Sequence, residues 1–330
     1  MAALAQIGIP HIDIRYRLQD RRFPKGWYCV SDTRDIPESG IMPVSLLNMQ
    51  MVVYRCADGH IQVADAYCPH LGAHLASSDG CVRNGRVVFP FHKWEFDGAT
   101  GRLEHIPYTK LVPKASLKLH PTREADGKVM IWFDPNGRDL EGHPYDGAEY
   151  LDGDEWALFD TRDWEMTVPF RDILENLFDT AHFTQLHRTE DTPSIRSTER
   201  TDYGLRIVFD FAGDGLPLDR MEFSFTGISN VTQYFEGRDP EGRRWKVLAV
   251  FSLTPINEQR IWQRVRMFQS SGNPEELVPM IGAAVIGRIC DEVEQDLKVL
   301  NFKKHLEHPL LCAGDGPINK YRSYSAEFFG

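Results

Sequence analysis

Three long stretches of alternating polar and apolar residues restrict the fold of this chain more than any other feature. They span residues 205–211, 244–253 and 259–268, all in the second half of the sequence. Successive side chains of a β-strand point to opposite faces, so a period of two predicts strands with one buried face. We therefore expect antiparallel strands in this half of the protein.

Helical segments accompany these strands. Residues 168 to about 186 have helical spacing, with Asp172 and Glu175 near the start, where the helix dipole favours carboxylates. Residues 274 to about 305 predict one or two further helices. Together these elements predict an α+β domain, a sheet with helices gathered against one side.

The first half of the chain has a different pattern. Residues from about 27 to 134 predict short strands separated by turn signals, including a hairpin around Asp58-Gly59. Residues 135–154 are rich in Gly, Pro and acidic side chains and predict a linker. A length of 330 residues suits about two domains. We expect an all-β domain in residues 1–150, with its core in 27–134, and an α+β domain in residues 151–330.

Composition excludes several classes of function. Lys and Arg number 37 against 48 Asp and Glu, and this net charge of −11 argues against a nucleic-acid partner. The chain has no run of 18 apolar residues, so we expect no membrane span, and its N-terminus is not a convincing signal peptide. The six cysteines are scattered, which predicts reduced thiols and a cytoplasmic protein.

The second half also contains candidate ligands for a metal. His182 and His187, together with Asp296, are the two imidazoles and one carboxylate that suit a non-haem Fe(II) with open coordination positions. Five residues correspond to about 140° on a regular helix, so convergence of the two histidines requires a helix end or a distortion. Asp179 lies one turn earlier and is placed to hydrogen-bond a ligand histidine.

Two alternatives to this metal site remain open from the residues alone. Three acidic neighbours compete with Asp296 for the role of third ligand: Asp291, Glu292 and Glu294. The two histidines are also explained by an ordinary surface or core pair without a metal. Nearby apolar residues are candidates for lining a substrate pocket, although core packing explains them equally well: Phe178, Phe183, Val285 and Ile286.

A second candidate site lies in the first half. Cys68 and His70 form a Cys-x-His pair, and His92 occupies the histidine position of a Cys-x-x-His pair. Two thiolates on one iron and two imidazoles on the other are the ligands of a Rieske [2Fe–2S] centre. Here the second cysteine position is Phe89, which cannot ligate iron, and the nearest spare thiol, Cys81, lies eight residues earlier.

With these motifs, the chain resembles the terminal oxygenase component of Rieske-type non-haem iron oxygenases over nearly its whole length. The residues that carry the resemblance are 22–27, 65–75, 90–97, 106–108, the Asp179-x-x-His182-x-x-x-x-His187 motif and Glu294-Gln-Asp296. Within that family it is similar to the branch of 3-ketosteroid 9α-hydroxylases and cholesterol 7-desaturases. This branch assignment depends on residues 66–73 and on the sequence around Asp296.

The resemblance implies a fold and a set of residue roles. It implies an N-terminal Rieske domain and a C-terminal catalytic domain of helix-grip shape. His182, His187 and Asp296 would hold the mononuclear Fe(II), while Cys68, His70 and His92 would bind the [2Fe–2S] cluster. Asp179 would connect His182 to His92 of a neighbouring subunit in a homotrimer. Electrons would come from an NADH- or NADPH-dependent reductase, directly or through a ferredoxin.

The implied activity is the hydroxylation or desaturation of an apolar, steroid-like polycyclic substrate with O₂. Phe89 departs from the family pattern and leaves two explanations: a recent or engineered loss in an oxygenase, or a natural relative that gave up the cluster. A cluster-deficient relative would act as a mononuclear-iron enzyme with another reductant. It could alternatively be a catalytically silent ligand-binding subunit of an oligomer.

Overall fold

The first half of the protein is built from three antiparallel sheets. The computed structural model describes residues 23–138, 140, 156–189, 192–202, 204–210 and 218–329. The strand orders are β1-β11-β10, β2-β3-β4-β9 and β5-β6-β7-β8. The strands are β1 (Gly26–Asp32), β2 (Ile41–Leu46), β3 (Met49–Arg55), β4 (Ile61–Asp65), β5 (Cys81–Arg83), β6 (Arg86–Val88), β7 (Glu95–Asp97), β8 (Leu103–His105), β9 (Leu119–His120), β10 (Thr122–Ala125) and β11 (Lys128–Phe133), with a 3-10 turn η1 (Thr33–Asp35).

Tight turns explain why these short strands pair with their sequence neighbours. β5 and β6 form a hairpin through Asn84 and Gly85, whose φ angles are 52° and 75°. Two successive positive φ values match the right-handed twist of the flanking strands. The hairpin expected around Asp58-Gly59 joins β3 to β4. The prediction of an all-β first half is confirmed.

The second half contains one seven-stranded antiparallel sheet of order β12-β18-β17-β16-β15-β14-β13. The strands are β12 (Trp156–Met166), β13 (Ser194–Arg200), β14 (Gly204–Asp210), β15 (Leu218–Thr226), β16 (Asn230–Arg238), β17 (Arg244–Asn257) and β18 (Arg260–Ser270). All three alternating stretches of the sequence fall in this sheet, in β14, β17 and β18. Side chains facing the helices, such as Phe223, Val231 and Leu253, belong to the largest buried hydrophobic cluster.

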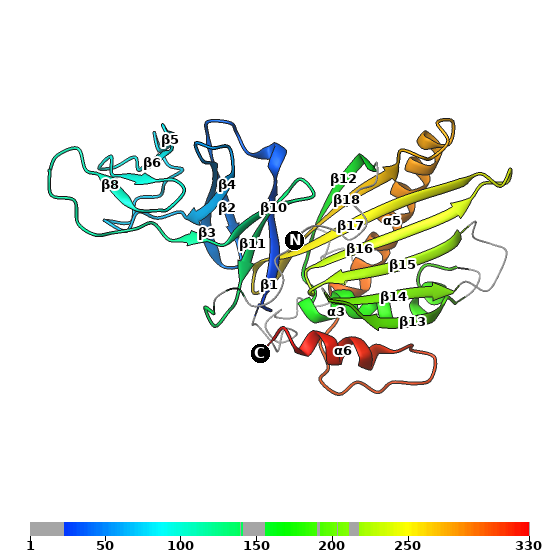
Figure 1. Ribbon diagram of the computed structural model, residues 1–330. Coiled ribbons are helices and arrows are strands. Elements are labelled where there is room, and N and C mark those ends of the chain that lie inside the picture. Colours follow the sequence, from blue (N-terminus) through cyan, green and yellow to red (C-terminus); the bar gives the residue numbers. More distant parts are fainter. Residues whose placement is uncertain are drawn as a thin grey trace.

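The helices lie against one side of this sheet, as expected (Figure 1). They are α3 (Phe170–Glu175), the 3-10 turn η2 (Asn176–Phe178), α4 (Ala181–Gln185), α5 (Val278–Leu300) and α6 (Ile318–Ala326). The segment 274–305 contains a single long helix, α5, over Val278–Leu300. The helical spacing over 168–186 corresponds to three short helical segments, α3, η2 and α4. The proposed linker lies largely outside the described residues, so the boundary near residue 150 stays a prediction.

The two halves form an elongated molecule. Figure 1 shows the β5–β8 sheet at one end and the seven-stranded sheet with α5 at the other. Hydrogen bonds join the halves where β1 lies against the start of β16 and the end of β17: Asn230 Nδ2 donates to the Trp27 carbonyl at 2.9 Å, and Thr254 Oγ1 donates to the Cys29 carbonyl at 2.7 Å. Among the helices of the described segments, none is both long and apolar enough to cross a bilayer.

Candidate metal centre

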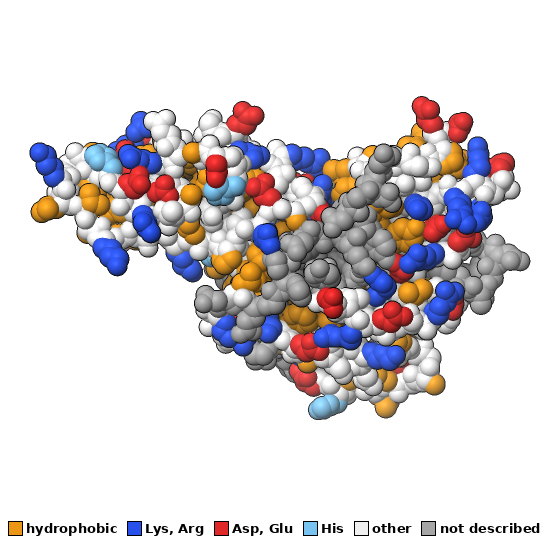
Figure 2. Space-filling view, viewed as in Figure 1, with side chains coloured by type: hydrophobic (Ala, Val, Ile, Leu, Met, Phe, Trp, Pro, Cys, Tyr) orange, Lys and Arg blue, Asp and Glu red, His pale blue; other side chains and the backbone are white. Residues whose placement is uncertain are grey.

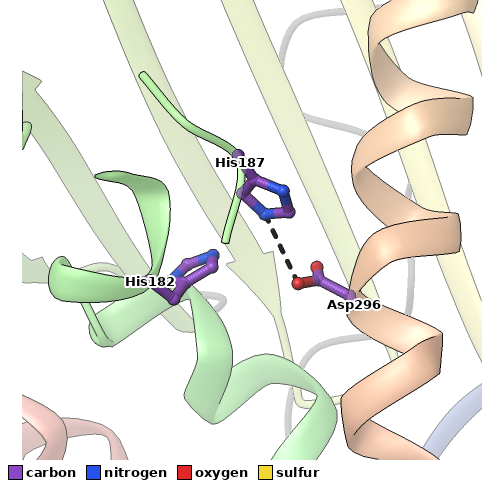
Figure 3. Close-up of side chains that lie close together, drawn as sticks. All are labelled: His182, His187 and Asp296. Atoms are coloured by element: carbon purple, nitrogen blue, oxygen red, sulfur yellow. Dashed lines mark ion pairs between the residues drawn. The ribbon is translucent and has the colours of Figure 1, made fainter. Parts of the chain in front are cut away.

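The structure brings His182, His187 and Asp296 together at one point. Their ligand atoms all lie within 4.8 Å of one another, and the three side chains point toward a common centre (Figure 3). His187 Nε2 lies 3.3 Å from Asp296 Oδ1. This buried carboxylate oxygen makes no hydrogen bond within the described part of the chain, as expected for an atom that binds a cation. The donor set and its geometry therefore fit a divalent metal such as Fe(II).

A helix end allows the two histidines to converge. His182 lies in α4, which ends at Gln185, so His187 follows the helix and is not restricted to its spiral. The amides of Leu186 and His187 both donate to the His182 carbonyl, at 2.7 and 3.3 Å, and close the final turn tightly. The ring centroids of His182 and His187 are 5.0 Å apart. The expected break between the ligands is thus the C-terminus of a five-residue helix.

Hydrogen bonds to the far ring nitrogens orient both histidines. His182 Nδ1 contacts the main-chain carbonyl of Asp179, and His187 Nδ1 lies 3.1 Å from Gln295 Oε1. Both partners are acceptors, so each Nδ1 carries the proton and each Nε2 is left free for a metal. Asn176 Nδ2 lies 3.4 Å from His182 Nε2, at the edge of the same centre.

The contact of Asp179 with His182 differs from the expected one. The sequence suggests that the Asp179 carboxylate accepts a hydrogen bond from a ligand histidine, but the atom that contacts His182 is the main-chain oxygen of Asp179. Its carboxylate accepts from the Ala181 amide at 3.2 Å and remains partly exposed at the start of α4. The side chain is consequently available for another contact.

The choice of Asp296 over its acidic neighbours follows from the face of α5 on which each residue lies. Asp291 and Glu294 are exposed. Glu292 lies one turn before Asp296 on the same face, but its Oε1 accepts from Arg288 Nε at 2.8 Å. Only Asp296 points its carboxylate at both histidines.

Buried ion pairs fix α3, which precedes the ligand segment. Glu175 accepts from Arg322 of α6 at 2.7 Å and from Lys303 at 3.1 Å. Asp172 lies 2.7 Å from His305 Nδ1. Both carboxylates are buried, so these contacts hold α3 against the C-terminal segments with charge-assisted hydrogen bonds.

The electrostatics of His187 favour a cation at this centre. Burial alone lowers the pKa of His187, but the Asp296 carboxylate and Gln295 more than offset it, so the pKa lies above its ordinary value. Groups that stabilise a proton on this imidazole also stabilise a metal ion beside it.

A largely apolar pocket opens onto the three ligands. Its space, including the part open to solvent, is about 790 Å³. Apolar lining residues come from α3, α4, the sheet and α5: Met166, Ile173, Leu174, Phe183, Phe223 and Ile289. Of the suggested lining residues, Phe183 is present, whereas Phe178 packs in the core against Phe225 and Tyr321.

Sequence reasoning missed several polar residues of this site. Gln295 orients His187, and Asn176, Gln233 and Gln263 line the pocket together with Glu292, which the sequence indicated only as a competing ligand. Gln233 and Gln263 had a detectable signal, because each interrupts the apolar positions of an alternating strand.

The residues of the second site also come together, with one departure. The rings of His70 and His92 have centroids 4.8 Å apart, and His70 stacks on Trp94 at 4.2 Å. Cys68 is buried nearby in the same half. Phe89 occupies the fourth ligand position, so the residues present do not provide a complete ligand set for a [2Fe–2S] cluster.

Comparisons with known families agree with this arrangement. A family model described as the Rieske [2Fe-2S] domain matches residues 26–116, and one described as the 3-ketosteroid 9alpha-hydroxylase C-terminal domain matches residues 131–329.

Individual relatives lead to the same branch. A probable 3-ketosteroid-9-alpha-monooxygenase oxygenase component of Rhodococcus rhodochrous is 27% identical, covering 93% of this chain and 80% of the relative. A cholesterol 7-desaturase of Bombyx mori is 34% identical, covering 93% of this chain and 70% of the relative.

Solved structures agree on the fold. Dicamba monooxygenase bound to dicamba superimposes with a TM-score of 0.71 at 19% identity, covering 92% of this chain and 96% of that one. NdmA of Pseudomonas putida, in a mutant form with caffeine, gives 0.74 at 18% identity, covering 96% and 92%. On the evidence of both family matches and these relatives, the chain belongs to the Rieske non-haem iron oxygenases, enzymes of the branch that contains 3-ketosteroid 9α-hydroxylases and cholesterol 7-desaturases.

Proposed function

We propose that the protein is an oxygenase component that hydroxylates or desaturates an apolar, steroid-like polycyclic substrate at Fe(II) held by His182, His187 and Asp296. The observation that carries this proposal is the convergence of the three ligands at an apolar pocket. Relatives named as steroid and sterol enzymes support the substrate class.

In this reaction the three ligands would bind the metal and the apolar residues of the pocket would bind the substrate. The two imidazoles and the carboxylate would hold the metal, which would supply oxygen activation when bound, and would leave an open face toward the pocket. The apolar walls exclude water and hold the substrate against that open face. Hydroxylation places one oxygen atom of O₂ in a C–H bond and reduces the other to water, whereas desaturation reduces both atoms to water. Both outcomes consume two electrons.

The electrons must come from outside the catalytic half. We propose an NAD(P)H-dependent reductase, directly or through a ferredoxin, and a homotrimer in which a neighbouring subunit approaches the iron. The β5–β8 end of the molecule lies far from α5 within one chain, which supports transfer between chains (Figure 1).

The surface of that end fits an interface between subunits. Tyr67, Leu71 and Phe91, on the loops that carry His70 and His92, and Tyr108, whose ring lies near His92, are each at least half exposed. On the face shown in Figure 2, apolar side chains lie exposed among charged ones at this end. The six free cysteines support a reducing, cytoplasmic location.

A peroxide-driven reaction tests the catalytic site independently of the electron supply. Hydrogen peroxide provides both the oxygen and the electrons, so Fe(II)-loaded protein should convert sterols or 3-ketosteroids into products with one added oxygen or two fewer hydrogens. Mass spectrometry detects either change, and His187→Ala is the matched inactive variant. Iron-loaded protein that neither binds nor converts any member of a steroid panel would contradict the proposed substrate class.

Asp179 tests the proposed transfer between subunits. In a Phe89→Cys background, which has the complete ligand set, Asp179→Ala should leave iron content and peroxide-driven conversion unchanged. Reductase-driven turnover should fall by about 100-fold or more, the scale for loss of an essential positioned group. Asp291→Ala, at an exposed residue of α5, is the control. Full reductase-driven activity of Asp179→Ala would exclude the bridge.

A further inference from the structure

The N-terminal half retains three ligands of a cluster site. Cys68 follows β4 in a turn that the Gly72 amide closes on the Cys68 carbonyl at 2.9 Å. His70 and His92 face each other across 4.8 Å between ring centroids. The Nδ1 atom of His70 is buried and has no hydrogen-bond partner among the described residues. A buried imidazole nitrogen without a hydrogen-bond partner, next to a second histidine, is arranged as in a metal-binding site.

The fourth ligand position is filled by hydrocarbon. Phe89 follows β6, and its amide donates to the Trp94 carbonyl at 3.1 Å. The side chain is 1% exposed and packs edge-to-face on Phe96, with ring centroids 5.5 Å apart. It belongs to the same buried cluster as Cys68 and Leu75. A phenyl ring in this place has no lone pair that could bind iron.

Cys81 is close in space but lies on the wrong face of its hairpin. In the β5–β6 pair, Cys81 is opposite Val88. Directly paired residues of antiparallel strands share a face, and successive residues alternate between faces. Cys81 therefore points with Val88, away from the side on which Phe89 lies.

Cys56 is excluded by distance. Its Sγ donates to the Gly98 carbonyl at 3.5 Å, and the Gly98 amide binds Gly85 at the turn end of β6. Gly85 is four residues before Phe89, roughly 13 Å along an extended strand. Cys29 lies at the junction of the two halves, while Cys290 and Cys312 belong to the C-terminal half. No thiol of the chain can replace the missing ligand.

The retained ligands do not form an alternative site for one metal ion. Across the described segments, His182, His187 and Asp296 form the only group of three His, Cys, Asp or Glu side chains gathered closely enough to hold one metal ion. Cys68, His70 and His92 do not form such a group, as expected of ligands that bind two different irons.

We propose that this chain folds its N-terminal domain without a [2Fe–2S] cluster, and that Phe89 alone is responsible. The buried hydrophobic side chains around Phe89 and Phe96 stabilise the loops that a [2Fe–2S] cluster would otherwise hold together. This inference concerns the N-terminal domain and does not depend on the proposed reaction at the other site.

Acid-labile sulfide and electron paramagnetic resonance of the reduced protein test the proposal directly. After anaerobic expression with iron and cysteine, the protein as it stands should contain no sulfide and give no cluster signal. Phe89→Cys should gain about two sulfides and two irons per chain, with absorption in the visible range. The matched control is Phe91→Cys, which adds a thiol two residues away on a side chain that is 65% exposed.

The outcomes separate cleanly. Sulfide near two per chain in the unaltered protein overturns the proposal, and its loss in Cys81→Ser would identify Cys81 as the substitute ligand. A folded Phe89→Cys protein without sulfide overturns the assignment to Phe89 alone. If that variant fails to fold, judged by circular dichroism, the sulfide content of the unaltered protein still decides. The iron content that Asp296→Ala removes measures metal binding at the catalytic site. The proposed function is therefore tested by iron content and activity, and the absence of the cluster is tested by sulfide content.

Discussion

His187 shows, at the scale of single residues, how neighbouring side chains orient a ring nitrogen that can bind a metal. Gln295 holds its Nδ1 and Asp296 faces its Nε2, and these two residues are neighbours on α5. One helix therefore supplies both a ligand and the group that orients another ligand. The exposed Glu294, one residue earlier, contributes to neither contact.

Replacement of Gln295 by Leu should weaken iron binding without unfolding the protein. The His187 ring would lose the acceptor that fixes its tautomer, and loss of such a partner typically costs about 10- to 100-fold in metal affinity. Competition with a chelator, read as iron retained per chain, measures the effect. Glu294→Gln, a similar change at an exposed neighbour, should retain normal affinity; equal losses in both variants would exclude an orienting role.

His120 should make stability depend on pH. It is buried with Nε2 2.8 Å from Asp65 Oδ1, and burial lowers its pKa in spite of this contact. Since the folded state binds the proton more weakly than the unfolded chain, the free energy of unfolding falls as pH drops below about 6.5. The slope attributable to this group is at most about 1.4 kcal/mol per pH unit.

Urea denaturation between pH 5 and 8 would show this dependence. His120→Gln should flatten the curve below about pH 6.5, the ordinary pKa of histidine. The exposed His105 is the control, and His105→Gln should leave the curve unchanged. A His120→Gln curve parallel to that of the unaltered protein would contradict the predicted shift.

At the scale of elements, the inner face of the sheet combines apolar walls with two amides. Gln233 of β16 and Gln263 of β18 are almost fully buried and line the pocket. The Gln233 side-chain amide donates to the sulfur of Met221 at 3.8 Å, a weak acceptor. A buried amide with so weak a partner is well suited to bind an oxygen atom of a substrate.

Gln233→Leu should therefore weaken binding of a steroid that carries a hydroxyl or keto group. The expected loss is about 10-fold, corresponding to one hydrogen bond of roughly 1 kcal/mol or slightly more, whereas the matching hydrocarbon should bind as before. Calorimetry on iron-loaded protein measures both ligands. Thr232→Val lies next on the same strand but on the opposite face, and it should change neither affinity; equal weakening for both ligands would indicate a purely structural role.

The elements also show what the sequence could and could not predict. Alternation over 244–253 and 259–268 correctly predicted β17 and β18, because side-chain period alone determines which face is buried. Helical spacing over 168–186 predicted helix in this segment, but it did not show that the segment is divided into α3, η2 and α4. The break depends on tertiary contacts, such as Gly316 lying against the Phe178 carbonyl, that no local pattern records. Likewise, the two histidines marked the metal site, while the orienting role of Gln295 required the structure.

At the scale of the whole molecule, the missing ligand limits electron transfer between subunits to a chain in which the cluster is restored, as in Phe89→Cys. A chain without its own cluster has no internal electron carrier at its N-terminal end, so a separate redox protein must reduce the catalytic metal. The apolar loops around His70 and His92 would then serve contacts between subunits without carrying electrons. Assembly and electron transfer, which coincide in an intact oxygenase of this kind, would be separate properties here.

The junction between the two halves should be as important to stability as either core. Besides Asn230 and Thr254, Ser229 Oγ donates to the Trp27 carbonyl at 2.6 Å, and Lys128 is completely buried near Ser252. These polar groups have little access to water, so their hydrogen bonds cannot be replaced by solvent when one partner is removed.

Thr254→Val is the sharpest test of this junction, because it keeps the shape of the side chain and removes one hydroxyl. Loss of the bond to the Cys29 carbonyl should lower the free energy of unfolding by about 1–3 kcal/mol. It should also begin to separate the unfolding of the two halves in a calorimetric scan. Thr198→Val, on β13 at the far edge of the sheet, removes a buried hydroxyl that has no partner in the described structure and should cost nothing. Equal destabilisation by both variants would mean that the sheet, and not the junction, responds to the change; a selective effect of Thr254→Val would show that the two halves stabilise each other through this contact.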